Sequence, residues 1–317
     1  MFPHVYEHGL RTMRETFGLE IVEYPSVRFS PEFAAAHPSA RAADLNDAFA
    51  DESIAAIVTV IGGDDSVRIL PFLDVAGAVA HPKILLGYSD TTTQLLALAG
   101  AGLITFNGPA VMAGLAQAAH LPGLEAHIRA VLFEPTDSYD YRPFGYRAAD
   151  YPAWETQPGD RVGEITADTG WRWLQGGTAA TGRLTGGCIE VLAMMVGTPH
   201  WPSPEFFAGR ILFLETSEEV PTPSQVGYWL RNYGAQGILS SISGLVIGRP
   251  RGYSPEMVAE LDAVVLQQLR EWGAMTIPVL AGADIGHIDP QWVIPHNVLA
   301  ELDPARDSFR LLEPAVR

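Results

Sequence analysis

The chain has 317 residues, 47% of them hydrophobic, so it can bury a sizeable core, and its length suggests about two domains of ~150 residues each. A net charge of −17, from 20 basic and 37 acidic side chains, repels phosphate backbones and anionic lipids and so argues against nucleic-acid or membrane binding. The single cysteine, Cys188, excludes an internal disulfide and the usual multi-cysteine zinc patterns.

Targeting and cofactor signals are not visible in the sequence. No stretch approaches the ~20 uninterrupted apolar residues of a membrane span. The start "MFPHVYEHGLRTMRE" lacks the basic and apolar regions of a signal peptide. Together with the lone cysteine, this predicts a cytoplasmic protein. Without an H-E-x-x-H ligand cluster or a Gly-rich nucleotide fingerprint, we expect neither a metal nor a cofactor.

The first part of the chain alternates between helix-like and strand-like segments. Helical patterns cover 4–18, 39–51, 66–74 and 91–101, and strand-like runs cover 19–25, 54–63, 83–89 and 103–109. This alternation predicts an α/β fold with a doubly wound parallel sheet covered by helices on both faces. Because α/β chains usually open with a strand, we expect a first strand to be absent ahead of the opening helix.

The rest of the chain divides into two parts. Residues 135–180 are rich in proline, glycine, aromatic and acidic residues without a sustained period, which predicts a linker with a long ordered loop. Strand-like runs follow at 209–215, 243–250 and 276–282, helical patterns at 222–233 and 254–273, and short strand candidates at 291–297, 299–303 and 308–313. We therefore expect an N-terminal domain at 1–134 and a mixed α/β domain at 181–317.

Ser89 lies in "ILLGYSDTTTQLLAL", where a buried strand passes into a helix. A sharp turn from a strand into a helix exposes the residue at its tip above the sheet, as in the nucleophile elbow of hydrolases. The match to G-x-S-x-G is partial, because Thr91 stands in place of the second glycine. Ser89 as a helix N-cap is therefore an alternative interpretation.

A serine nucleophile needs a base and an acid that orients it, and the chain offers one candidate for each. His287 follows a predicted strand, between Gly286 and a proline-containing loop, where α/β folds collect ligands. Glu215 ends the apolar run "RILFLE". The alternatives are a surface loop histidine and an ordinary charge at the end of a strand.

Five motifs together resemble the LD-carboxypeptidase family of serine peptidases, which includes the microcin C immunity peptidases. They are "VTVIGGDDSVRILPFLD", "ILLGYSDTTTQLLAL", "GRLTGGCIEVLAMMVGTPHWP", "GRILFLETSEEVP" and "ADIGHIDPQWVIPHN", in the family's order and over nearly the whole chain. The resemblance implies a Ser-Glu-His triad of Ser89, Glu215 and His287. It also implies a Rossmann-like N-terminal domain, a homodimer, and an active site in the cleft between the two domains.

Residues 62–65, "GGDD", offer backbone donors for the oxyanion of such a reaction. We expect the N–H groups of Gly63 and Asp90 to form this oxyanion hole, Asp90 because it starts a helix and Gly63 because it lacks a Cβ. A tight turn after a strand is the alternative role for the glycine pair. Cys188 stands where the family often has asparagine, and an apolar-flanked lone thiol is more typical of a core than of a nucleophile.

The substrate class is left open between two alternatives. Murein-recycling members of the family cut an L,D bond ahead of a terminal D-alanine, whereas immunity-type members cleave an amide of a peptide-like nucleotide and carry a tryptophan on a longer loop. Trp171 and Trp173 resemble the immunity type, and Trp171 is the candidate that stacks on a planar group; packing of the loop is its alternative role. A small-ligand-binding protein without catalysis, on the same fold, is the alternative function.

Overall fold

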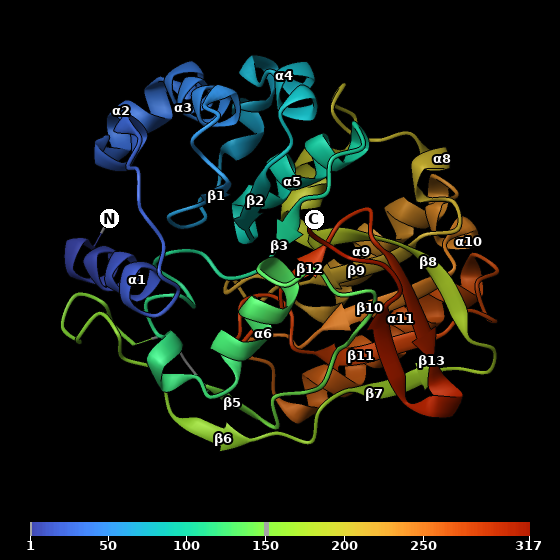
Figure 1. Ribbon diagram of the computed structural model, residues 1–317. Coiled ribbons are helices and arrows are strands. Elements are labelled where there is room, and N and C mark those ends of the chain that lie inside the picture. Colours follow the sequence, from blue (N-terminus) through green and yellow to red (C-terminus); the bar gives the residue numbers. More distant parts are fainter. Residues whose placement is uncertain (1, 149–151) are drawn as a thin grey trace.

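The computed structural model describes residues 2–148 and 152–317 and contains two main sheets with helices on their outer faces (Figure 1). The smaller sheet has the order β1-β2-β3-β12. β1 (Ala56–Val58), β2 (Ile84–Gly87) and β3 (Phe106–Asn107) are parallel neighbours, and β12 (Ile294–Pro295) pairs antiparallel with β3. A segment from the C-terminal part of the chain therefore completes the N-terminal sheet.

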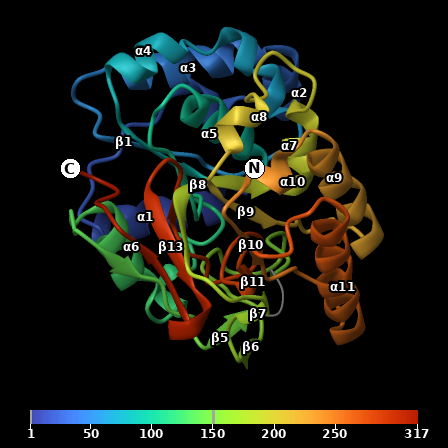
Figure 2. The same cartoon turned by 90° about the vertical axis from the view of Figure 1, so that its right-hand side faces the viewer.

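Helices cover both faces of this smaller sheet, as the alternation of segments predicted. In Figures 1 and 2, α2–α4 lie on one side of the strands, and α1 and α6 lie on the other. Proline occupies the first turn of α1, α2 and α3, where its missing N–H costs no hydrogen bond. The helices are α1 (Pro3–Glu15), α2 (Pro31–Ala36), α3 (Pro38–Ala50), α4 (Val75–Ala80), α5 (Thr92–Gly100) and α6 (Leu124–Leu132).

The larger sheet has eight strands in the order β4-β14-β13-β8-β9-β10-β11-β7. The four neighbouring strands from β8 to β11 are parallel, and β9, β10 and β11 are buried along their whole length, which explains their continuous apolar runs. The strands are β4 (Tyr139–Asp140), β7 (Arg172–Gln175), β8 (Ala180–Cys188), β9 (Ile211–Glu215), β10 (Gly244–Gly248), β11 (Val279–Ala283), β13 (Leu299–Asp303) and β14 (Ser308–Leu311).

Five helices accompany the larger sheet, and α9 and α11 pack together along one side of it in Figure 2. Thr222 caps α9 in a reciprocal capping box with Gln225, and Ser254 caps α11. These helices are α7 (Ile189–Met195), α8 (Pro204–Phe207), α9 (Pro223–Ala235), α10 (Ile238–Ser241) and α11 (Pro255–Glu271). Among the described residues, no helix is both long and apolar enough to cross a membrane.

Three predicted segments differ in the structure. Residues 19–25 form no strand, because no neighbouring strand pairs with them; Leu19 and Ile21 instead pack against the core. The helix expected at 66–74 consists of two short 3₁₀ turns, Ser66–Arg68 and Leu70–Phe72.

The segment expected to be a linker, 135–180, contributes strands to the fold. β4 and β7 form the two edges of the larger sheet, and β5 (Tyr146–Ala148) pairs with β6 (Ile165–Ala167). These strands are only two to four residues long, too short to show a two-residue period in the sequence. Residues 149–151 of the segment lie outside the described residues.

Candidate active site

Ser89 follows β2 at the tip of the strand-to-helix turn that the sequence predicted. Its φ is +59°, a left-handed backbone conformation that a side chain with a Cβ adopts at a steric cost. Thr91, not Ser89, is the N-cap residue of α5, and Thr91 makes no side-chain capping bond. The Ser89 side chain is half-buried and stands at the edge of the sheet, so the geometry is that of a nucleophile elbow.

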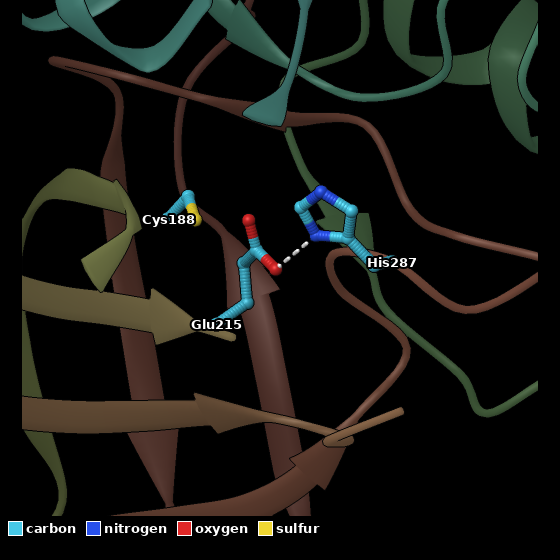
Figure 3. Close-up of side chains that lie close together, drawn as sticks. All are labelled: Cys188, Glu215 and His287. Atoms are coloured by element: carbon cyan, nitrogen blue, oxygen red, sulfur yellow. Dashed lines mark hydrogen bonds and ion pairs between the residues drawn. The ribbon is translucent and has the colours of Figure 1, made fainter. Parts of the chain in front are cut away.

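Glu215 and His287 form a buried hydrogen-bonded pair next to this turn. Glu215 ends β9, and its Oε2 lies 2.7 Å from Nδ1 of His287. Figure 3 draws this hydrogen bond as a dashed line. The other ring nitrogen of His287, Nε2, lies 2.9 Å from Oγ of Ser89. The three side chains that the sequence singled out are thus connected in the order serine, histidine, carboxylate.

Gly286 allows this pair to form. Its φ is +94°, and a Cβ on Gly286 would lie 2.3 Å from Oε2 of Glu215. Only glycine combines that backbone conformation with room for the carboxylate.

The surroundings of His287 favour its protonated form. Burial lowers the pKa of its imidazole, but the carboxylates of Glu215, Glu218 and Glu190 outweigh burial and raise the pKa above the usual 6.5. The ring of Tyr88 also packs against His287, with centroids 4.9 Å apart. His287 is therefore held in a buried site with a strongly negative environment.

Glu218 is a neighbour of His287 that sequence reasoning missed. Its Oε2 lies 3.0 Å from Nε2 of His287, the same nitrogen that contacts Ser89. Glu190, also missed, accepts hydrogen bonds from the backbone N–H and the hydroxyl of Ser217, which holds the loop after β9 in place. Both glutamates lie in motifs that the sequence analysis quoted, but their contacts depend on how distant strands pair: β8 with β9 for Glu190, and β9 and β11 through β10 for Glu218.

Two glycines approach the serine from the loop after β1. A Cβ on Gly62 would lie 2.8 Å from Oγ of Ser89, and a Cβ on Gly63 would lie 3.1 Å from Oδ2 of Asp90. The buried Asp90 carboxylate accepts hydrogen bonds from the N–H groups of Asp65 and Ser66 and from the Ser66 hydroxyl. Asp90, expected only to offer its N–H, thus also ties this loop to the elbow.

A buried group of Cys188, Glu215 and His287 also has the residue types of a metal site. One ligand atom from each lies within 4.8 Å of the others, and Figure 3 shows the three side chains side by side. However, Nδ1 of His287 is already bonded to Glu215, and Nε2 lies 2.9 Å from Oγ of Ser89. Both ring nitrogens therefore have partners in the candidate triad, which this arrangement fits better than a metal site.

Trp171 and Trp173 lie at β7, the edge strand that pairs with β11. Both indole N–H groups donate to Oδ1 of Asp307, each at 2.7 Å, and Trp171 packs edge-on against Trp292. Residues two apart along an extended segment face the same side of a sheet, which agrees with the shared partner of the two indoles. These contacts favour the packing role for Trp171.

Two family models match this chain. Residues 2–108 match the N-terminal domain of LD-carboxypeptidases, and residues 181–302 match their C-terminal domain. The chain belongs to the LD-carboxypeptidase family. The N-terminal match contains Ser89, and the C-terminal match contains Glu215 and His287.

Relatives within the LD-carboxypeptidase family carry two kinds of name. The microcin C7 self-immunity protein MccF of Escherichia coli is 28% identical, over 83% of this chain and 75% of its own length. A probable murein peptide carboxypeptidase of Bacillus subtilis is 26% identical, over 92% of this chain and 82% of its own. The solved MccF-like protein of Streptococcus pneumoniae, in complex with AMP, superposes with a TM-score of 0.85 at 26% identity, covering 98% of this chain and 93% of that one.

Proposed function

We propose that the protein is a serine hydrolase that cleaves an amide bond in a small peptide-like substrate, with Ser89, His287 and Glu215 as its triad. The observation that carries the proposal is the position of His287, with one ring nitrogen 2.9 Å from Ser89 Oγ and the other 2.7 Å from Glu215. Hydrogen bonds of this length are what proton transfer from a serine requires.

The proposed reaction has two halves. Ser89 Oγ attacks the carbonyl carbon, Nε2 of His287 accepts the hydroxyl proton, and the same nitrogen then donates it to the departing amine. A water activated by His287 hydrolyses the acyl-enzyme and regenerates Ser89. Glu215 holds the imidazole in the correct tautomer throughout and stabilises its charged form.

The oxyanion formed on the substrate carbonyl requires donors on the far side of Ser89. We assign this role to the backbone N–H groups of Gly63 and Asp90. The support is proximity: the 62–66 loop lies against Ser89 and Asp90, and the Asp90 carboxylate fixes that loop.

Two substrate classes follow from the relatives. A murein tetrapeptide, cut ahead of its terminal D-alanine, corresponds to the Bacillus subtilis relative, and an aminoacyl nucleotide of the microcin C type corresponds to MccF. In both, the bond to be cleaved joins an acyl group to a nitrogen, so the same triad serves either. The family resemblance further supports a homodimer, which sedimentation of the purified protein tests.

The deciding experiment compares both substrates with matched variants. The wild-type protein is incubated with a murein tetrapeptide and with an aminoacyl sulfamoyl adenosine, and products are followed by mass spectrometry. Ser89→Ala, His287→Ala and Glu215→Ala are each expected to lower turnover by on the order of 10⁴–10⁶, with double variants costing little more, because triad members act as a unit. Near-normal turnover in any of the three folded variants removes that residue from the mechanism.

The alternative, a binding protein without catalysis, makes the opposite prediction. It requires no hydrolysis of either substrate and an unchanged ligand affinity in the Ser89→Ala variant. Trapping of Ser89 by a fluorophosphonate probe, seen as a mass increase in the wild type and not in Ser89→Ala, separates the two alternatives without knowledge of the natural substrate.

A further inference from the structure

A cavity of about 110 Å³ lies beside the ends of β10 and β11, and none of the three candidate triad residues lines it. Its walls include Ile247 and Gly248, the last residues of β10, and Ala281 and Gly282 of β11. The carboxyl ends of parallel strands are where α/β folds bind ligands. The cavity adjoins the triad without belonging to it, because a Cβ on Gly248 would lie 2.9 Å from Cβ of Glu215.

Charged side chains of both signs line this cavity. They are Arg147, Arg172, Arg249, Asp168 and Asp262, three cations against two anions, which gives a net charge of +1. The whole chain, in contrast, has a net charge of −17. A positive lining in an acidic protein attracts a carboxylate, and the two aspartates attract an ammonium group.

Arg249 is the buried cation of the cavity, with a side chain that is 7% exposed. Its Nη2 donates to Oδ1 of Asp168 at 2.9 Å and to the Gly282 carbonyl at 3.1 Å, and its Nη1 donates to Asp284. Because these acceptors come from separate segments, the guanidinium is held in one orientation before a ligand binds. Such preorganisation lowers the entropy cost of binding.

Arg147 and Arg172 are the exposed cations of the cavity, with side chains 42% and 43% exposed. Nη2 of Arg172 donates to both carboxylate oxygens of Asp262, at 3.0 and 2.8 Å. Its Nη1 faces Gly282, where a Cβ would lie 3.3 Å away, so the missing side chain leaves room in front of this nitrogen. Arg147 approaches Asp168 only to 3.8 Å, which is longer than a hydrogen bond, so a ligand can rearrange this pair.

Part of the lining is apolar. Ile247, Val258, Leu261 and Ala281 contribute aliphatic side chains, and all of them except Val258 are buried. The volume corresponds to several water-sized groups, which suits a ligand of about six non-hydrogen atoms. A ligand in this cavity therefore meets both charges and an aliphatic surface within a short distance.

We infer that this cavity is a binding site for a small aliphatic α-amino acid in its zwitterionic form. The carboxylate pairs with the arginines, whose planar N–H groups match its geometry, and the ammonium group pairs with the aspartates. The aliphatic side chain contacts the apolar wall. A simple anion would leave two aspartates facing a like charge, and a simple cation would face three arginines. The site goes beyond the proposed function, because it contains no triad residue and needs no turnover.

Alanine and two analogues that each lack one charged group test the inference. Propionate lacks the amino group, and ethylamine lacks the carboxylate. Binding of both enantiomers of alanine and of the two analogues to the wild-type protein is measured by calorimetric titration at neutral pH, without substrate. We expect the preferred enantiomer to bind at least about tenfold more tightly than either analogue, because each analogue leaves charged groups of the cavity without a partner. An analogue that binds as tightly as alanine, or no binding of either enantiomer at millimolar concentrations, overturns the inference.

Two variants locate the bound amino acid. Arg147→Gln and Arg172→Gln each remove one guanidinium from an exposed ion pair, whose loss costs little stability. Each should weaken alanine binding about tenfold. Arg142→Gln is the matched control, because Arg142 is also exposed and pairs with Asp140 at 3.7 Å but does not line the cavity.

The control variant should keep the wild-type affinity for alanine. If both test variants bind alanine as the wild type does, the amino acid binds elsewhere, for example at the candidate triad, and the inference is overturned. An equal loss in Arg142→Gln would mean that net charge alone explains the effect, which also overturns it. Because no step of the experiment requires hydrolysis, a failure of the proposed function leaves these outcomes unchanged.

Discussion

Gly286 and Glu215 approach each other so closely that a Cβ on Gly286 would lie 2.3 Å from the carboxylate oxygen that bonds His287. The glycine lies in the left-handed region, with φ +94°. A methyl group there has to displace Glu215 or the loop that carries His287. The alignment of the candidate triad therefore depends on a residue that takes no part in the chemistry.

Gly286→Ala should abolish most activity. We expect a loss of kcat of about 10³-fold or more, since misplacing Glu215 has effects similar to removing an orienting acid. Gly273→Ala is the control, because Gly273 also has a positive φ, +76°, but has open space around its Cβ position. It should cost about 1 kcal/mol of stability with normal kcat. Equal effects of both changes on kcat would mean that backbone strain alone explains the loss.

The pH dependence of activity should reflect the acidic environment of His287. Only neutral imidazole accepts the serine proton, and burial lowers the pKa of His287 less than Glu215, Glu218 and Glu190 raise it. Activity should therefore be low at and below pH ~6.5 and rise as the pH passes the raised pKa. The check is kcat/KM from pH 5 to 10, with folding followed by circular dichroism at each pH. A rising limb centred below pH ~6.5 would contradict the expected direction.

Asp90→Ala should weaken both folding and catalysis. The change leaves the N–H groups of Asp65 and Ser66 and the Ser66 hydroxyl without their buried acceptor. We expect a loss of about 2–3 kcal/mol in the free energy of unfolding and a lower kcat with little change in KM. Asp74→Ala is the control, because Asp74 caps α4 and should cost about 1 kcal/mol with normal kcat. An unchanged kcat in a folded Asp90→Ala variant would mean that the position of the 62–66 loop does not affect catalysis.

Trp171→Ala should act mainly on stability. Removal of the indole eliminates the hydrogen bond to Asp307 and the contact with Trp292, which should cost about 3 kcal/mol. Turnover of a murein peptide and of a nucleotide-like substrate should fall by the same factor, and Trp173→Ala should resemble it, because both indoles bond the same carboxylate. A selective loss for the nucleotide-like substrate, without a lower melting temperature, would instead place Trp171 in the binding site.

Much of the fold and the main candidate residues could be predicted from the sequence, because they follow from local patterns. The buried strand β9 is a continuous apolar run that ends in Glu215, and Ser89 stands at a visible change from strand to helix. Residues 291–297 were expected to contain a strand, and β12 lies within them.

Features that depend on distant partners could not be predicted. Glu218 lies in a polar loop without periodicity, and its contact with His287 exists only because β9 and the loop after β11 end at the same edge of the larger sheet. Residues 19–25 have strand-like composition, but a strand also needs a neighbour to pair with, which the sequence does not specify. The pairing of β12 with β3 is equally a matter of tertiary structure.

The pairing of β12 with β3 has a mechanical consequence. β12 follows His287 by a short loop and lies in the same sheet as β2, the strand that leads into Ser89. The backbone N–H of His296 also donates to the Thr105 carbonyl, and the Asn297 side chain donates to the carbonyls of Ala99 and Leu103. Ser89 and His287 are thus connected to the same sheet. A hinge motion that separated them would have to break the β3–β12 pairing and these hydrogen bonds. A gene split between residues 134 and 181 would therefore yield a first fragment whose β3 edge stays unpaired until the second fragment supplies β12.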